Sequence, residues 1–221
     1  MKRLFISCLI AVFFFSGCSL FRSKEEKPAP ELASEGIDQF KSGNYRKSIE
    51  SFETLKNWYP FSKYAILAEL KIADARYKLK EYEEAIFAYE EFENLHPRNE
   101  AVPYVIYQIG LCYFEQIDTQ DRDQAPARKA LDTFKRLVKQ FPTNPYAKKS
   151  AGLIKKSLKS IAGHEIYVGL FYFKGKHYRA AIKRFRALVS NHPDVGAHQK
   201  ALAYIARCEA LLEKRDGEHK R

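Results

Sequence analysis

Tyr82-Glu83-Glu84-Ala85-Ile86-Phe87-Ala88-Tyr89-Glu90-Glu91-Phe92, followed by Pro97, is the stretch that decides the fold of this chain. Its apolar side chains recur at offsets of three and four residues, which places them on one stripe of an α-helix, and the proline ends that helix. The same spacing returns in two complete copies and in one copy without the leading aromatic residue: Tyr45, Ser48, Ile49, Phe52, Leu55 and Pro60; Tyr178, Ala181, Ile182, Phe185, Leu188 and Pro193; Ala130, Leu131, Phe134, Leu137 and Pro142. The chain therefore repeats one helical unit.

A second helix is predicted upstream of each complete copy. A small residue lies 12 positions before the small residue of the unit, and an aromatic residue follows four positions later: Gly36 and Phe40, Ala73 and Tyr77, Gly169 and Phe173. Two helices approach closely only where their side chains are small, so Gly36 with Ser48, and Ala73 with Ala85, predict the crossing points of antiparallel pairs. Such repetition is typical of helical hairpins that stack and bury their apolar faces on one another.

Gly43-Asn44-Tyr45 and Glu84-Ala85-Ile86 resemble the inter-helix turn and second-helix start of the tetratricopeptide repeat. The resemblance implies an all-α solenoid of about five helical hairpins, in which the first helix of each hairpin lines a concave groove. The family's groove positions fall here on Phe40, Lys41, Leu70, Asp74, Tyr77, Lys78, Tyr104, Tyr107, Leu111 and Phe114. Aromatic side chains with a few polar groups suit an extended peptide. Alternatively, Tyr77 and Phe114 pack between the hairpins and bind nothing.

The N-terminus has the pattern of an export signal. The uncharged run from Leu4 to Phe15 would span about 18 Å as a helix, short of the ~30 Å core of a bilayer, so residues 1–17 are predicted to be a signal peptide. Phe15-Ser16-Gly17-Cys18 resembles a bacterial lipobox, which implies lipidation of Cys18 and a flexible tether over residues 18–31. Ser19 resembles the residue that directs such lipoproteins to the outer membrane. Ordinary secretory cleavage nearby is the alternative.

The mature chain divides into two sets of repeats. Residues 32–142 are predicted to hold N-terminal repeats 1–3, residues 143–214 the C-terminal repeats, and residues 215–221 a charged tail that frays. About eight residues are inserted between the two helices of the third repeat, from Gln116 to Pro126, either as a plain loop or as one that contacts a partner. Cys112 and Cys208 are expected to pack as small apolar side chains without forming a disulfide.

The charge of the chain lies entirely in its C-terminal third. Residues 1–142 hold 21 basic and 21 acidic side chains, whereas residues 143–221 hold 17 basic and 6 acidic ones, which accounts for the net charge of +11. Nucleic acid is a poor partner for an exported chain despite this charge. An acidic protein or anionic lipid headgroups fit better, and a solvated lysine face that aids solubility is the third interpretation.

Motifs of catalysis are missing from the sequence. His164-Glu165 lacks a second histidine at metal-binding spacing, and neither a glycine-rich phosphate loop nor a nucleophile elbow is present. The carboxylates around Glu83 and Glu90 fall on outer helical faces. We therefore predict a non-enzymatic binding protein without a metal ion or other cofactor.

Three stretches resemble the BamD (ComL-like) family of outer-membrane lipoproteins: Tyr59-Pro60-Phe61-Ser62-Lys63-Tyr64, Asp121-Arg122-Asp123-Gln124, and His164-Glu165-Ile166 through Lys183-Arg184. The resemblance implies a scaffold of the outer-membrane β-barrel assembly machine, lipid-anchored at the periplasmic face of the outer membrane. Its N-terminal repeats would bind targeting segments of unfolded outer-membrane proteins, and its C-terminal repeats would dock a POTRA domain of BamA beside other Bam lipoproteins. Arg184 would be an ion-pair donor there, with Lys183, Arg122 and Asp123 as further partner-binding residues. The alternative is a structural envelope lipoprotein associated with peptidoglycan or a Tol-Pal-like system.

Overall fold

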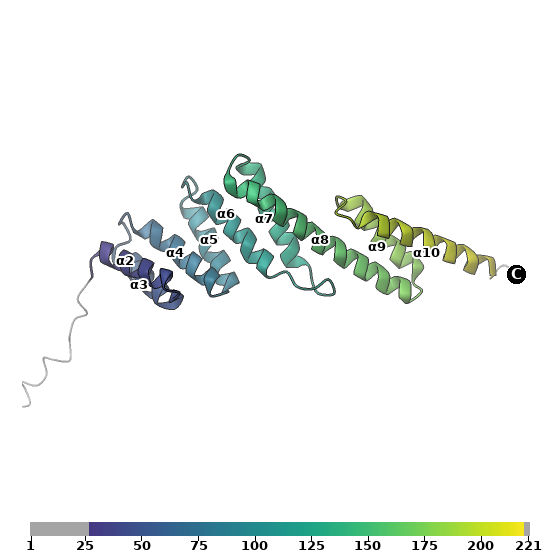
Figure 1. The fold of residues 1–221 in the computed structure, drawn as a ribbon, viewed down its shortest axis with the longest axis horizontal. Helices are drawn as coiled ribbons and strands as arrows, with labels where there is room; N and C mark the ends of the chain where they lie inside the picture. Colours follow the sequence, from purple (N-terminus) through teal and green to yellow (C-terminus); the bar gives the residue numbers. More distant parts are fainter. Residues whose placement is uncertain (1–26, 219–221) are drawn as a thin grey trace, which may run out of the picture.

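The computed structural model describes residues 27–218, and all of the regular secondary structure within that range is α-helical (Figure 1). The helices are α2 (Ala29–Lys41), α3 (Tyr45–Trp58), α4 (Ala65–Lys78), α5 (Tyr82–Leu95), α6 (Val102–Glu115), α7 (Ala125–Gln140), α8 (Pro145–Lys174), α9 (Tyr178–Asn191) and α10 (His198–Glu218). The prediction of an all-α repeat fold is confirmed. The predicted signal peptide and Cys18 lie outside the described residues.

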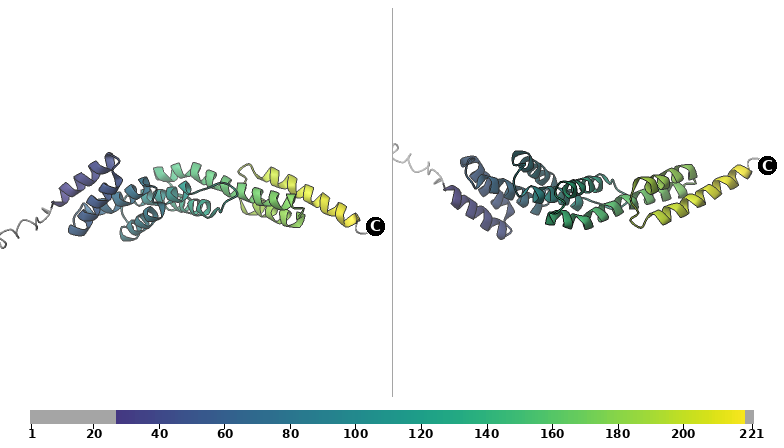
Figure 2. Two further views of the ribbon diagram at one scale, coloured as in Figure 1. Left: turned by 90° about the horizontal axis from the view of Figure 1, so that it is seen from below. Right: turned by 90° about the horizontal axis from the view of Figure 1, so that it is seen from above.

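The helices form hairpins that follow one another along the long axis of an elongated molecule (Figure 1). Each helix packs on the next one in the chain, so α2/α3, α4/α5, α6/α7 and α8/α9 are hairpins and α10 covers the last of them. Figure 2 shows the stack from two further sides as a curved rod rather than a globule. Because every hairpin shares its apolar faces with its neighbours, the core runs along the stack instead of around one centre.

Small residues lie at the helix crossings, where the repeat pattern predicts them. Ser48 Oγ donates a hydrogen bond of 2.8 Å to the carbonyl oxygen of Gly36, which joins α3 to α2 in the core. A Cβ atom added at Gly110 would lie 2.4 Å from Cε1 of Phe134, and one added at Gly169 would lie 2.4 Å from Cε1 of Phe185. The ring from the second helix of these hairpins therefore occupies the space that a larger residue on the first helix would need.

The joint between the two halves is the 30-residue helix α8. Asn144 caps its N-terminus by accepting a hydrogen bond from the backbone N–H of Tyr146 at 2.9 Å, and Pro145 occupies its first turn. Pro142 and Gly169 are 27 residues apart, whereas Pro97 and Gly110 are 13 apart, and the additional residues extend this single helix. Its N-terminal half packs on α7 and its C-terminal half on α9, so one rigid element joins both predicted sets of repeats (Figure 1).

The loop of residues 116–124 lies against the middle of α8. Ser160 donates a hydrogen bond of 2.6 Å to Oε1 of Gln124, whose side chain is buried. Nδ1 of His164 lies 2.7 Å from the carbonyl oxygen of Gln120, and the side chain of Gln120 covers Gly163, where a Cβ atom would lie 2.5 Å from it. The inserted loop is therefore packed against α8 and hydrogen-bonded to it.

Two predicted boundaries need correction. Helix α2 begins at Ala29, so the last residues of the predicted tether, 29–31, are helical. Pro30 is compatible with this because a proline in the first turn of a helix loses no hydrogen bond. Helix α10 continues to Glu218, so residues 215–218 of the predicted charged tail are helical. Within residues 27–218, no helix combines the length and apolar composition needed to cross a bilayer.

Candidate functional site

A row of aromatic side chains follows the first helices of the hairpins from α2 to α8. Phe40 on α2 stacks edge-on against Tyr45 and lies under the ammonium group of Lys71, 5.1 Å from its ring centroid. Tyr77 on α4 contacts Tyr82, with ring centroids 5.9 Å apart. Each of these rings is partly exposed, so the row has both packing contacts and an open face.

The row continues on α6 and ends on α8. Tyr104 and Tyr107, one helical turn apart on α6, both contact Tyr146 of α8, with ring centroids 5.4 and 5.3 Å away. Tyr146 is not among the groove residues predicted from the sequence, because the first turn of α8 lies outside the repeat pattern. Its position directly after the capping residue Asn144 and the proline of the first turn was the available signal. Phe114, near the end of α6, is also partly exposed.

Asp74 lies beneath this row and is 4% exposed. Its Oδ1 accepts hydrogen bonds of 2.7 Å from the hydroxyl groups of both Tyr89 and Tyr104, and its Oδ2 accepts one of 2.7 Å from Nζ of Lys71. Nε2 of Gln108 donates to the oxygen of Tyr104 at 2.9 Å and to that of Tyr89 at 3.3 Å. Both carboxylate oxygens of this predicted groove residue are thus engaged within the chain, and Asp74 ties α4 to α5 and α6.

The electrostatics of this network keep the tyrosines neutral. Burial, reinforced by the neighbouring Asp74 carboxylate, raises the pKa of Tyr89 and of Tyr104 above the ordinary value for tyrosine. Burial also raises the pKa of Tyr77 to about 12. Lys78 next to it is exposed and its Nζ lies 5.9 Å from the centroid of the Tyr77 ring. The row therefore presents aromatic faces and the exposed ammonium group of Lys78, a set suited to binding and not to proton transfer near neutral pH.

The residues predicted to contact a partner lie far from this row, in two places. Arg184 on α9 is about half exposed, and its Nη1 lies 3.5 Å from Oε2 of Glu165 on α8. Lys183 beside it is exposed. Arg122 and Asp123 are exposed on the 116–124 loop, where Asp123 accepts a hydrogen bond of 3.2 Å from Nη2 of Arg128. The five lysines at positions 148, 149, 155, 156 and 159 are exposed along α8.

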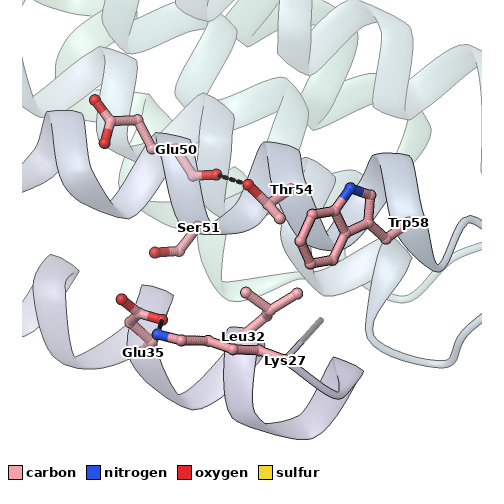
Figure 3. A pocket seen from close by; sticks show the side chains of 7 residues that line it. All are labelled: Lys27, Leu32, Glu35, Glu50, Ser51, Thr54 and Trp58. Carbon is pink, nitrogen blue, oxygen red and sulfur yellow. Dashed lines mark hydrogen bonds and ion pairs between the residues drawn. The ribbon is translucent and has the colours of Figure 1, made fainter. Parts of the chain in front are cut away.

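A hollow of about 150 Å³ lies at the N-terminal end of the stack, between α2 and α3 (Figure 3). Lys27 crosses its lower edge to form an ion pair of 2.7 Å with Glu35, while the indole of Trp58 lines the opposite side. Thr54 donates its hydroxyl hydrogen to the carbonyl oxygen of Glu50 at 2.8 Å. Lys27 is thus paired with Glu35 and Thr54 is bonded within its own helix, and no Ser-His or Cys-His pair lines this hollow.

The described residues also hold no cluster of three or more His, Cys, Asp or Glu side chains that is suited to a metal ion. Cys112 and Cys208 are both buried and free, as predicted. Burial raises the pKa of the Cys112 thiol to about 12 and also raises that of Cys208. These thiols are therefore protonated near neutral pH, and they pack as small apolar side chains.

Three known proteins are similar in sequence to this chain over most of its length. Each is named outer membrane protein assembly factor BamD. The protein from Vibrio cholerae is 30% identical over 213 residues, which cover 91% of this chain and 88% of the relative. The protein from Rickettsia prowazekii is 28% identical over 218 residues, covering 98% and 87%. The protein from Caulobacter vibrioides is 30% identical over 202 residues, which cover 89% of this chain but only 66% of that longer relative.

Solved structures agree with the fold. The TPR2AB domain of yeast Sti1, determined in its complex with pHSP90, superposes with a TM-score of 0.51 at 18% identity, covering 80% of this chain and 70% of that one. At that identity the likeness concerns the tetratricopeptide fold alone. The family model described as YfiO, outer membrane lipoprotein, matches residues 25–221. Because this match spans nearly the whole chain beyond its N-terminal segment, the chain belongs to the YfiO family of outer membrane lipoproteins.

Proposed function

We propose that this chain is a non-enzymatic scaffold for the assembly of outer-membrane β-barrel proteins. The observation that carries the proposal is the similarity, over 89 to 98% of the chain, to three proteins named as assembly factors of the outer membrane. In this proposal Cys18 is lipidated and holds the chain at the periplasmic face of the outer membrane, and residues 19–28 link that anchor to α2. The N-terminal repeats bind substrates, and the C-terminal repeats bind the assembly machine.

The substrate segments bind in the groove along the aromatic row on the first helices. The partly exposed rings of Phe40, Tyr77, Tyr107 and Phe114, with Tyr146 at the end of the row, support this, because aromatic faces hold apolar side chains of an extended peptide. Lys78 is exposed beside Tyr77 and forms no ion pair among the described residues, so its ammonium group is suited to a terminal carboxylate. Asp74 does not contact the peptide; it holds Tyr104 in position from beneath.

We expect the double variant Tyr77→Ala/Lys78→Glu to bind a peptide that ends in phenylalanine about tenfold more weakly than the original chain. The change removes an aromatic face and reverses the charge that would meet the terminal carboxylate. Fluorescence anisotropy with the labelled peptide measures this. Lys47→Glu is the control because Lys47 is exposed on the second helix α3, away from the row. An affinity unaffected by the double variant, or reduced equally by the control, would locate the substrate site elsewhere.

The C-terminal repeats dock a POTRA domain of BamA through the surface around Arg184, with other Bam lipoproteins as neighbours. Arg184 is about half exposed, and its contact of 3.5 Å with Glu165 is longer than a hydrogen bond, so the guanidinium keeps donors free for a carboxylate of a partner. The exposed ammonium group of Lys183 adds to the positive potential.

Arg184→Glu is expected to weaken association with BamA at least tenfold, since it places a carboxylate where the proposed ion pair needs a cation. Co-purification from solubilised outer membranes, with quantification of BamA, is the measurement. Arg186→Glu is a matched control: it lies on the same helix and also breaks an internal ion pair, the one with Glu209 at 2.7 Å. Unchanged co-purification of BamA with Arg184→Glu would refute the docking surface. Normal levels of outer-membrane proteins after depletion of this chain would instead favour a structural role in the envelope.

A further inference from the structure

A second groove lies between α3 and α5, on the side of α4 that faces away from the aromatic row. It has a volume of about 430 Å³, and Ile72 of α4 and Ala88 of α5 line its apolar part. A smaller hollow of about 40 Å³ shares Ile72, Ala88 and Glu91 with it and reaches Phe92. The groove and the smaller hollow therefore share an apolar surface formed by Ile72 and Ala88.

The opposite orientation of the two grooves follows from helix geometry. Ile72 and Arg76 are four residues apart and lie on one face of α4, whereas Asp74 and Lys78 are displaced from them by two residues each, about 200° around the helix. A ligand on the aromatic row and a ligand in this groove would therefore contact opposite faces of α4. Both sites can be occupied in one molecule.

Phe87 on the wall of the groove is 69% exposed, although it is an aromatic residue in the middle of a helix. Its position lies two residues after the small residue of the repeat. The equivalent positions of the other copies are Glu50, Asp132 and Lys183, all of them charged and exposed. In the three other hairpins this position therefore holds a charged side chain, whereas in the second hairpin it holds an aromatic ring. A ring at this position contributes little to the core. An apolar contact with another molecule is therefore the best physical explanation for an exposed phenylalanine here.

The charge at the rim is acidic. Glu83, Glu84 and Glu91 on α5 line the groove and are exposed. None of these three forms an ion pair within the described residues. Of the two cations that line it, Arg76 faces the carboxylate of Glu53 at 3.6 Å and Lys56 forms no ion pair within the described residues, so the four carboxylates of the lining outnumber its cations. The groove therefore presents three free carboxylates around an apolar hollow, and this pattern complements a basic segment with an apolar centre.

We propose that this groove binds a basic polypeptide segment, with one large apolar side chain of the segment packed against Phe87 and Ile72 and flanking lysines or arginines paired with Glu83, Glu84 and Glu91. The combination of an apolar depth and a carboxylate rim selects such a segment over an acidic one, because like charges at the rim would repel it. The site does not depend on the proposed function of the first-helix groove, and its loss would leave that groove intact.

The test is a binding measurement with a short fluorescein-labelled peptide in which one leucine is flanked on each side by an arginine and a lysine. We expect measurable binding to the purified chain that falls as the ionic strength rises to about 1 M, where screening limits charge interactions to about 3 Å. Phe87→Ser is expected to weaken binding about tenfold through loss of the apolar contact. Glu84→Lys/Glu91→Lys is expected to weaken it by a similar factor and to reduce its dependence on salt.

The matched control is Phe61→Ser, since Phe61 is fully exposed outside the groove and receives the same substitution. Two further peptides complete the design, one with glycine in place of leucine and one with glutamates in place of the cations; both are expected to bind more weakly than the first. Equal binding of all three peptides, no loss with Phe87→Ser, or an equal loss with Phe61→Ser would each overturn the proposal. The peptide that ends in phenylalanine, measured on the same Phe87→Ser variant, is expected to bind unchanged, so failure of this site and failure of the proposed function are distinguishable.

Discussion

Phe134→Ala is expected to lower the free energy of unfolding by about 3–5 kcal/mol, the range observed for truncation of a buried phenylalanine. The ring of Phe134 has no exposed surface and lies against Gly110, where even a methyl group would be only 2.4 Å from it. The ring belongs to the hairpin at the centre of the stack, where a cavity would face the neighbouring hairpins on both sides. Urea unfolding followed by circular dichroism measures the change. Phe87→Ala serves as the control, since its ring is 69% exposed, and is expected to change stability by less than about 0.5 kcal/mol.

A double-mutant cycle with Gly110→Ala sharpens this prediction. In the original chain, Gly110→Ala is expected to be destabilising by about 1–3 kcal/mol, because the new methyl group collides with the ring of Phe134. In the Phe134→Ala background the collision is gone, and the higher helix propensity of alanine, about 1 kcal/mol, makes the same change stabilising. The reversal of sign is the diagnostic result. Independent, additive effects of the two substitutions would mean that the ring and the glycine do not share one space.

Asp74→Leu is the second change with a large expected effect, a loss of about 3–5 kcal/mol of stability. The substitution keeps the branched shape of the side chain, although methyl groups are bulkier than oxygens, and it removes the acceptor of the hydroxyl groups of Tyr89 and Tyr104. Tyr89 has no exposed surface, so its hydroxyl group would lose this carboxylate without gaining water. Leaving a buried donor without its partner costs more than the original hydrogen bond contributes. Asp74→Asn keeps one acceptor oxygen and is expected to lose less.

The rescue experiment distinguishes a hydrogen-bond network from simple packing. Addition of Tyr89→Phe and Tyr104→Phe to Asp74→Leu removes the stranded hydroxyl groups, and stability is expected to return in large part, because apolar groups of the same shape replace both members of each pair. Urea unfolding of the single, double and triple variants gives the comparison. If the tyrosine substitutions deepen the loss instead, the network is not what Asp74 contributes.

The periodicity of the sequence was enough to predict the hairpins and their crossing points. Offsets of three and four residues report which face of a helix is apolar, and Pro60, Pro97 and Pro142 mark the ends of units, since proline cannot continue a helix. The predicted crossing of Gly36 with Ser48 is a contact within one hairpin. For that reason the repeat phase was enough to predict it.

The same reasoning was less complete for the candidate binding residues. Tyr77 and Lys78 occupy partly exposed positions along the row. The carboxylate of Asp74, by contrast, accepts hydrogen bonds from Tyr89 and Tyr104, which lie 15 and 30 residues away in the sequence. Tyr146, which completes the row, was not predicted, because it belongs to a helix start and not to the repeat. Local patterns specify the face on which a side chain lies. They do not specify which hydrogen-bonding group of another helix will meet it there.

By itself, the sequence determined an all-helical stack, the interior of each hairpin, the inert cysteines and the separation of charge between the two halves. Only the tertiary structure decided that α8 joins these halves as one continuous helix, that Gln120 covers Gly163, and that Phe87 faces an acidic groove on the opposite side of α4 from Asp74. The reason is physical: the first set depends on side chains a few turns apart along one hairpin. The second depends on the angle and distance at which successive hairpins pack, which arises from the sum of many contacts along the stack.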